Sequence, residues 1–307
     1  MERPFSSRIA IRSQLSREAL AEFLGTFVVL VFGIASVAQS VLSSENLGSS
    51  LSIHFSWGIG VMMGVYVSGG VSGGHLNPAV TLALSCLGRF PWKKVPVYML
   101  AQYLGSFVAS ACVYLVYMDA LNNFDGGKRL VEGEKATAGI WSTYPQSYVS
   151  TYNAFGDQIF GTAMLLVCVL AITDERNMNP PKGLIPVIIG LLVIAIGMTL
   201  GLNCGYPINP ARDLAPRIFT AIAGWGDSPF TFRDYNWFWV PIVGPLLGAI
   251  LGAFLYQLCV GFHWPKEETR ETKYQYNGPL NADEEKPGIV CRTVCDQPIS
   301  MEPTVKL

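Results

Sequence analysis

Asn209-Pro210-Ala211-Arg212-Asp213 is the stretch that decides the fold of this 307-residue chain. The same triplet occurs once before, as Asn77-Pro78-Ala79, and both copies lie in apolar surroundings at matching places in the two halves. Asparagine is a good N-cap, and proline is favoured in the first helical turn because its missing N–H would be unpaired there. Each triplet therefore predicts the start of a helix.

Both of these helices are too short to cross a membrane. After Asn77 roughly ten apolar residues precede Arg89, whereas a span needs about 20. The run after Pro210 is equally short and carries three charged residues, Arg212, Asp213 and Arg217. Such segments between full spans indicate re-entrant half-helices, which are tolerated only where protein or a watery cavity surrounds the backbone. Two half-helix N-termini would place positive dipole ends and two side-chain amides near the middle of the membrane.

Longer apolar runs predict six membrane spans. The expected spans cover residues 19–42, 53–71, 95–118, 154–173, 183–202 and 237–262. Residues 119–153 form a long polar loop, which we expect to be partly structured because loops of this length are usually functional or disordered. The sequence therefore predicts an all-α membrane protein with six transmembrane helices and two re-entrant half-helices.

Basic residues in the loops indicate the orientation of the chain. Lys and Arg concentrate in residues 1–18 and in the turns 89–94 and 174–182, and the opposite loops hold fewer. Both termini are therefore expected on the cytoplasmic side, with residues 1–18 as a cytoplasmic N-terminal segment. The composition becomes polar near the end, so residues 263–307 are expected to be a disordered cytoplasmic tail.

The two halves, about 19–120 and 154–262, repeat each other. Phe23-Leu24-Gly25-Thr26 matches Ile159-Phe160-Gly161-Thr162, and this alignment places Glu22 opposite Gln158. Three spans per half is an odd number, so the halves insert with opposite orientation, as in an inverted repeat with its functional site near the midplane. Glycines at helical contact spacing also predict close helix packing. They are Gly60 and Gly64, Gly197 and Gly201, and Gly244, Gly248 and Gly252.

Six spans with two Asn-Pro-Ala boxes resemble the aquaporin, or major intrinsic protein, family. The second box continues into Arg212-Asp213 and in this resembles the glycerol-conducting branch, the aquaglyceroporins. The resemblance runs over about residues 19–262. It implies a passive plasma-membrane channel for glycerol, water and other small neutral solutes such as urea, which excludes ions and protons. It also implies a homotetramer with one pore per subunit.

The resemblance implies roles for particular residues. The amides of Asn77 and Asn209 would face the pore as its central donors, and Arg212 would be the arginine of the selectivity filter. An arginine at membrane depth usually faces a cavity. The alternative for Arg212 is a structural ion pair with Asp213, which is otherwise expected to pair within the half-helix.

Three further filter positions fall on Trp57, Gly197 and Tyr206 by the same resemblance. Water-selective relatives have a histidine at the position of Gly197, where this chain has no side chain. Trp57 and Tyr206 can form an apolar corner opposite the donors of Arg212, and such an amphipathic slot fits a polyol. The alternative for Trp57 is an aromatic side chain that faces lipid near the membrane surface.

His75 lies two residues before Asn77, where the resemblance implies a structural histidine beside the pore. A second hypothesis makes His75 part of a pH-dependent gate, because histidine titrates near neutral pH. Glu22 lies on a span that could approach it.

Composition narrows the remaining function classes. Half of the residues are hydrophobic, 14% are charged and the net charge is −1, so nothing suggests nucleic-acid binding. The seven cysteines show no metal spacing, and no nucleophile–base pair or cofactor motif is evident, so an enzyme is not expected. A water-selective pore is disfavoured by Gly197. A coupled secondary transporter is disfavoured because four of the six spans have no charged residue.

Overall fold

Six long helices dominate the computed structural model, which describes residues 10–265. They are α2 (Gln14–Leu42), α3 (Ser50–Ser72), α5 (Val95–Asp125), α6 (Thr151–Thr173), α7 (Ile185–Leu200) and α10 (Val240–Cys259). Each is long and apolar enough to cross a membrane, with short 3₁₀ turns adding to α5, α7 and α10. Two shorter helices, α4 (Pro78–Cys86) and α8 (Pro210–Thr220), begin at the prolines of the two triplets. The six spans and two half-helices are thus confirmed.

Two of the long helices extend beyond the apolar runs that predicted them. Helix α2 begins at Gln14, where the Ser13 side chain accepts a hydrogen bond from a backbone N–H of the first turn. Helix α5 continues to Asp125 and ends at Gly126, which has a positive φ of 64°. Hydropathy marks the part of a helix that lies in lipid, whereas caps and glycines mark where the helix ends. The expected terminal segment 1–18 therefore includes the first turn of α2.

The connections hold less regular structure. The long loop before α6 is partly structured, as predicted, with a 3₁₀ turn at Ala138–Ile140 and a fully buried Trp141. After α8 the chain forms a π-helical turn, Ala221–Trp225, and the short helix α9 (Ser228–Thr231). Residues 1–9 and 266–307 lie outside the described part, so most of the expected disordered tail does too.

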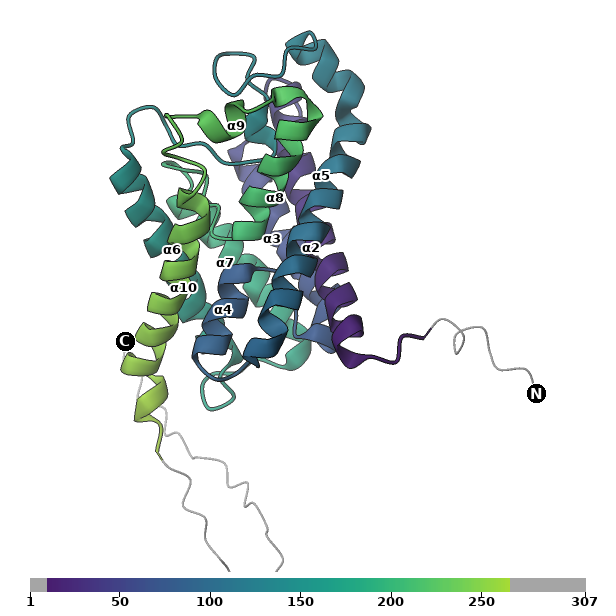
Figure 1. Ribbon diagram of the computed structural model, residues 1–307. Coiled ribbons are helices and arrows are strands. Elements are labelled where there is room, and N and C mark those ends of the chain that lie inside the picture. The colour runs from purple at the N-terminus through teal and green to yellow at the C-terminus, as the bar shows by residue number, and fades with distance from the viewer. Residues whose placement is uncertain (1–9, 266–307) are drawn as a thin grey trace, which may run out of the picture. The chain divides into compact units, whose positions relative to one another are not determined.

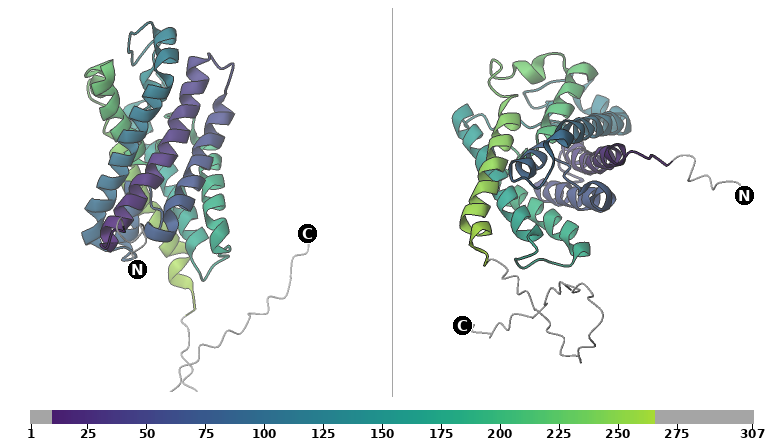
Figure 2. Two further views of the ribbon diagram at one scale, coloured as in Figure 1. Left: turned by 90° about the vertical axis from the view of Figure 1, so that its right-hand side faces the viewer. Right: turned by 60° about the horizontal axis from the view of Figure 1, so that its bottom comes forward.

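The helices pack as two equivalent halves. Helix α2 packs against α3 and α5, and α6 packs correspondingly against α7 and α10. Each half-helix contacts the last long helix of the other half, α8 against α5 and α4 against α10. Figure 1 shows α4 and α8 between the long helices, and Figure 2 shows the long helices side by side. This exchange brings the two half-helix tips together inside the bundle, as an inverted repeat requires.

Close approach of α6 and α10 depends on glycine. A Cβ atom on Gly248 would collide with the carbonyl oxygen of Ile159, and one on Gly252 with that of Ala163. The predicted role of these two glycines in helix packing is therefore confirmed.

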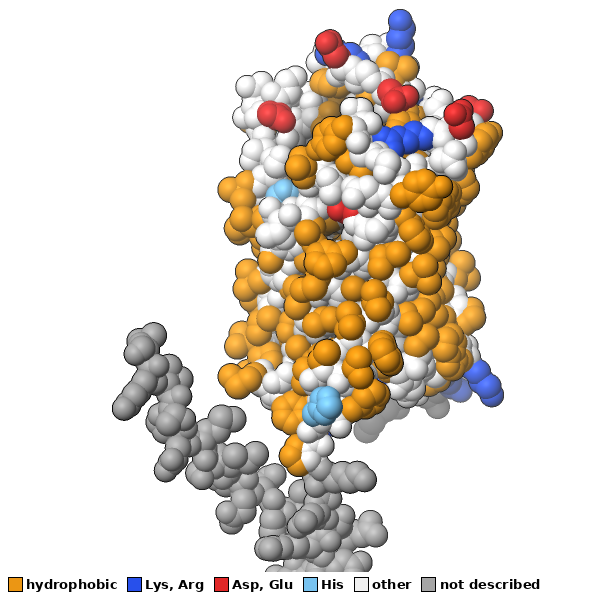
Figure 3. Space-filling view, turned by 90° about the vertical axis from the view of Figure 1, so that its left-hand side faces the viewer, with side chains coloured by type: hydrophobic (Ala, Val, Ile, Leu, Met, Phe, Trp, Pro, Cys, Tyr) orange, Lys and Arg blue, Asp and Glu red, His pale blue; other side chains and the backbone are white. Residues whose placement is uncertain are grey.

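The outer surface is apolar over the middle of the bundle. Figure 3 shows one side, where hydrophobic side chains form a wide band and charged side chains gather toward the two ends. The exposed apolar side chains include Leu100, Leu104, Leu115, Val116 and Phe254. A soluble monomer rarely exposes so large an apolar patch, whereas a bilayer core requires one. The chain is a multi-pass membrane protein.

Candidate functional site: a pore between two half-helix tips

The two asparagines of the triplets cap the half-helices. The Asn77 Oδ1 atom accepts a hydrogen bond of 2.8 Å from the backbone N–H of Ala79, and the Asn209 Oδ1 atom accepts one of 3.0 Å from Ala211. Helix N-termini leave backbone donors unpaired. The Asn77 oxygen satisfies one donor at its tip, and the Asn209 oxygen satisfies a second at its own, the backbone N–H of Arg212 at 3.3 Å. Each amide group is thereby fixed with its oxygen toward its own helix and its nitrogen free to donate elsewhere.

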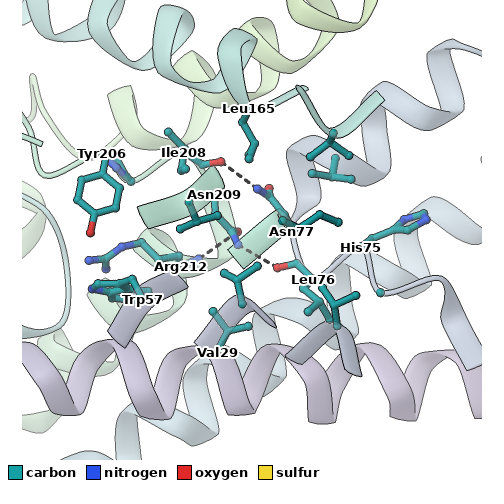
Figure 4. Close-up of a pocket in the computed structure, with 18 residues that line it drawn as sticks. Val29, Trp57, His75, Leu76, Asn77, Leu165, Tyr206, Ile208, Asn209 and Arg212 are labelled. Carbon is teal, nitrogen blue, oxygen red and sulfur yellow. Dashed lines mark hydrogen bonds between the residues drawn. The ribbon is translucent and has the colours of Figure 1, made fainter. Parts of the chain in front are cut away.

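The amide nitrogens join the two tips reciprocally. Asn77 Nδ2 donates to the carbonyl oxygen of Ile208 at 2.9 Å, and Asn209 Nδ2 donates to that of Leu76 at 2.9 Å (Figure 4). Leu76 and Ile208 have φ values of 53° and 38°, in the left-handed region that non-glycine residues rarely adopt. An amide carries two N–H donors, so one on each asparagine remains for a molecule in the cavity.

Equivalent polar side chains support the backbone leading to each tip. Glu22 is fully buried and accepts a hydrogen bond of 2.8 Å from the backbone N–H of Leu76. Gln158, its counterpart in the repeat, accepts one of 3.4 Å from the backbone N–H of Ile208. Glu22 and Gln158, which the sequence alignment places opposite each other, therefore each bind the backbone N–H of the residue directly before an Asn-Pro-Ala triplet.

A cavity of about 100 Å³ runs past the two tips, which is room for several waters because one water needs about 10–15 Å³. Figure 4 shows Trp57, Tyr206 and Arg212 at one end, His75 toward the other, and the two asparagines between them. Aliphatic side chains supply much of the remaining wall. They are Val29, Val61, Val65, Leu76, Val80, Leu165, Val169, Ile189, Val193 and Ile208. The cavity thus combines a few fixed donors with an apolar lining.

Arg212 and Trp57 lie together at one end of this cavity. The guanidinium carbon of Arg212 lies 4.2 Å from the centroid of the Trp57 ring, and its Nη1 atom donates to the carbonyl oxygen of Trp141 at 2.8 Å. Trp57 is only 5% exposed and lines the cavity, so the alternative of a lipid-facing ring is wrong. The guanidinium is thereby held against the wall.

Asp213 has partners of its own. Its carboxylate pairs with Arg217 at 2.7 Å, one turn further along α8, and both side chains are fully buried. The carboxylate also accepts a hydrogen bond of 2.8 Å from the backbone N–H of Thr143 in the long loop. The alternative ion pair between Arg212 and Asp213 is therefore not the arrangement found. Asp213 instead fastens α8 to the loop.

Gly197 does not line the cavity, although its neighbour Tyr206 does. A Cβ atom on Gly197 would lie 2.7 Å from Cζ of Tyr206 and 2.9 Å from Nδ1 of His54. The space beside Gly197 is therefore filled by the tyrosine and histidine rings, and the place of Gly197 in the filter stays a prediction. Gly197 and Gly201 both make room for the His54 ring of α3, the helix against which α7 packs, so their predicted role in close helix packing stays a prediction.

His75 lines the cavity and lies in an aromatic cluster. Its Nδ1 atom is 3.1 Å from Oγ1 of Thr81, and its ring centroid is 4.7 Å from that of Phe90 and 5.1 Å from that of Tyr98. Glu22 accepts a hydrogen bond of 2.9 Å from the backbone N–H of His75. The approach that the gate hypothesis expected thus occurs through the backbone, and the gate itself stays a prediction.

Sequence reasoning missed two residues that shape the Arg212 end. Trp141 accepts the hydrogen bond from Arg212 across 71 residues of sequence, and no motif or spacing links the two. Gly33 makes room for Trp57, because a Cβ atom there would collide with the indole ring. The only sequence signal for Gly33 is that it is a glycine within an apolar span.

A cavity enclosed by one chain, with two half-helix tips at its middle and six surrounding spans, defines a membrane channel. The chain matches the major intrinsic protein family over residues 10–256 and belongs to that family.

Individual relatives show which members of this family the chain is similar to. The chain is 49% identical over 265 residues to aquaporin-9 of Homo sapiens, covering 86% of this chain and 90% of that protein. It is 52% identical over 246 residues to aquaporin-7 of Mus musculus, covering 80% of each. The crystal structure of the aquaglyceroporin from Plasmodium falciparum superposes with a TM-score of 0.72 at 34% identity, covering 80% of this chain and 97% of that one. These findings confirm the resemblance to the aquaglyceroporins.

Proposed function

We propose that this chain is a passive channel for glycerol and water. The observation that supports this most is the cavity itself, in which Arg212 and two asparagine amides face a largely aliphatic lining. A polyol has hydroxyl groups and C–H groups along one backbone, so it needs donors and apolar contact together. Water requires only the donors and is small enough to use the same path.

Passage would proceed without a conformational cycle. The asparagine amides are held by reciprocal hydrogen bonds, and Arg212 is held by Trp141 and by the face of Trp57. A fixed donor can replace a hydrogen bond to water without reorganising, which keeps the barrier for a hydroxyl group low. In this proposal Trp57, Tyr206 and Arg212 form the selectivity filter, and Gly197 supports it from behind Tyr206.

Ions and protons would be excluded by charge. Following the general account of aquaporin-type pores, a fixed arginine and the positive ends of two half-helices raise the barrier for cations and protons. In this chain those groups are Arg212 and the N-termini of α4 and α8.

Four further features belong to the same proposal. Urea is small and neutral and would pass by the same donors. The protein would be a homotetramer in the plasma membrane, with cytoplasmic termini because Lys and Arg concentrate on that side. No enzymatic activity is proposed.

Stopped-flow light scattering on proteoliposomes tests the function. Under an inward glycerol gradient without an ion gradient, we expect shrinkage followed by fast re-swelling, and no re-swelling with sucrose. Fast shrinkage without glycerol entry would indicate a water-selective pore. Glycerol entry only when an Na⁺ or H⁺ gradient is applied would indicate a coupled transporter.

The gate hypothesis for His75 and Glu22 has its own test. A gate that contains His75 predicts a glycerol permeability that changes between pH 5 and 8, because the unperturbed pKa of histidine is about 6.5. The change should be absent in His75→Phe. A permeability that is flat over this range would leave His75 with the structural role.

A further inference from the structure

His54, which no motif singled out, lies behind the filter. It is half-buried in the second turn of α3, three residues before Trp57. Its Nδ1 atom is 2.8 Å from the hydroxyl oxygen of Tyr206, across 152 residues of sequence. The two ring centroids are 5.2 Å apart and the ring planes are tilted by 56°, so the rings also pack against each other.

Two glycines form the space that holds these two rings, Gly197 in α7 and Gly201 directly after its end. A Cβ atom on Gly197 would lie 2.8 Å from the hydroxyl oxygen of Tyr206 and 2.9 Å from Nδ1 of His54. A Cβ atom on Gly201 would lie 3.2 Å from each ring. His54 and the tyrosine hydroxyl therefore occupy a closely fitted space beside Gly197, while Tyr206 also lines the cavity.

Tyr206 needs such support because its backbone is unusual. Its φ is 39°, in the left-handed region, and it is followed by Pro207 in a segment without regular secondary structure. No helix or strand therefore fixes the ring. The hydrogen bond to His54 provides a fixed point on the rigid helix α3.

We propose that His54 is a positioning residue for the selectivity filter, which holds the Tyr206 ring back against α7 and so keeps the pore wide enough for glycerol. The inference rests on the proposed glycerol channel. Without the histidine, the tyrosine hydroxyl would be left beside apolar α7 without a partner. A buried unpaired hydroxyl is unfavourable, so the ring would turn its hydroxyl toward water in the lumen and narrow the path.

Two substitutions separate the hydrogen bond from the filling of space. His54→Leu keeps a similar volume but removes the polar atom. His54→Asn is smaller, but its side-chain amide places a polar atom where Nδ1 lies, able to donate or accept. The proposal expects His54→Leu to lower glycerol permeability by about fivefold or more, with water permeability changing by less than about twofold. It expects His54→Asn to keep the ratio of glycerol to water permeability near that of the parent.

A second background tests whether His54 acts through Tyr206. In Tyr206→Phe the hydroxyl is absent, so nothing drives the ring into the lumen. Adding His54→Leu should then leave the permeability ratio unchanged. Independent effects of the two substitutions would show that His54 does not act through the hydroxyl and would overturn the proposal.

Glycerol and water permeability are both measured by stopped-flow light scattering on the same proteoliposomes, and their ratio is compared between the parent and the His54 variants. A parent protein that conducts water and no glycerol refutes the proposed function, whatever the variants do. A glycerol-conducting parent with an unchanged ratio in His54→Leu refutes the role of His54 alone. A ratio that falls further in His54→Asn than in His54→Leu would show that volume matters and the hydrogen bond does not. Should His54→Leu fail to insert, His54→Phe, which also fills the space without a hydrogen bond, takes its place with the same expected loss.

Discussion

Gly197 shows how the absence of one side chain shapes this pore. The residue does not touch the lumen, yet the ring of Tyr206 lies where its Cβ atom would be. Any side chain at position 197 would need the space that the ring of Tyr206 already fills. The width at this point is therefore set by a residue pair and not by either residue alone.

Substituting Gly197 should close the path to glycerol first. In Gly197→Val the new side chain meets Cζ of Tyr206, which must move toward the lumen. Overpacking costs about 1–3 kcal/mol. An increase of about 1.4 kcal/mol in a barrier lowers a rate about tenfold, so glycerol permeability should fall about tenfold or more while water permeability falls less. Stopped-flow light scattering measures both.

Gly156→Val provides the matched control. Gly156 lies in the long helix α6, and a Cβ atom there meets nothing within 4 Å. Both variants place a β-branched residue in a helix, so the intrinsic cost is shared. Equal losses of glycerol permeability in the two variants would show that Gly197 does not set the width of the filter.

At the scale of elements, the half-helix α8 depends on the loop before α6. The buried pair of Asp213 and Arg217 is the centre of that contact, since Arg217 Nη2 also donates to the carbonyl oxygen of Thr143 at 2.7 Å. A half-helix has few turns of its own, so this attachment holds its tip in line with α4. The same loop supplies the carbonyl oxygen of Trp141 to Arg212.

Asp213→Ala should destabilise the protein strongly. Removing one partner of a buried ion pair leaves the other charge uncompensated, which costs about 3–5 kcal/mol. The Thr143 hydroxyl also donates to the Asp213 carboxylate. Thr143→Val removes this donor but keeps the backbone N–H to Asp213, so it should cost only about 1 kcal/mol. Thermal unfolding in detergent, followed by tryptophan fluorescence, ranks the two. Equal shifts of the unfolding midpoint would mean that the ion pair contributes little.

At the scale of the whole molecule, one chain completes the pore. Residues from both repeats line the same cavity, and each half-helix packs against the opposite repeat. A homotetramer built from such chains would contain one independent pore in each subunit. The apolar outer faces would then contact lipid and neighbouring subunits.

Mixed proteoliposomes test this independence. When parent protein and Gly197→Val are co-expressed at varied ratios and purified together, glycerol permeability should fall in proportion to the fraction of variant. A pore shared between subunits would give a steeper fall, because one variant subunit would impair the whole assembly. The amount of reconstituted protein is measured separately by quantitative gel densitometry, because Gly197→Val also lowers water permeability to a smaller extent.

The sequence by itself determined the spans, the half-helices and the repeat. The spans and half-helices depend on hydropathy, on N-cap chemistry and on proline, which act within a few residues of each other. The repeat is indicated by the matching positions of Asn77 and Asn209 in the two halves of the chain. Helix ends were less accurate, as α5 shows, because a helix can continue beyond the membrane.

Only the tertiary structure decided which side chains meet. The contacts of Arg212 with Trp141, of Asp213 with Thr143 and of His54 with Tyr206 each join residues at least 70 positions apart. Their geometry depends on how helices pack, which local sequence does not encode. Gly197 is an example: the sequence shows that a side chain is missing there, and the packed structure shows that the ring of Tyr206 fills the space beside it.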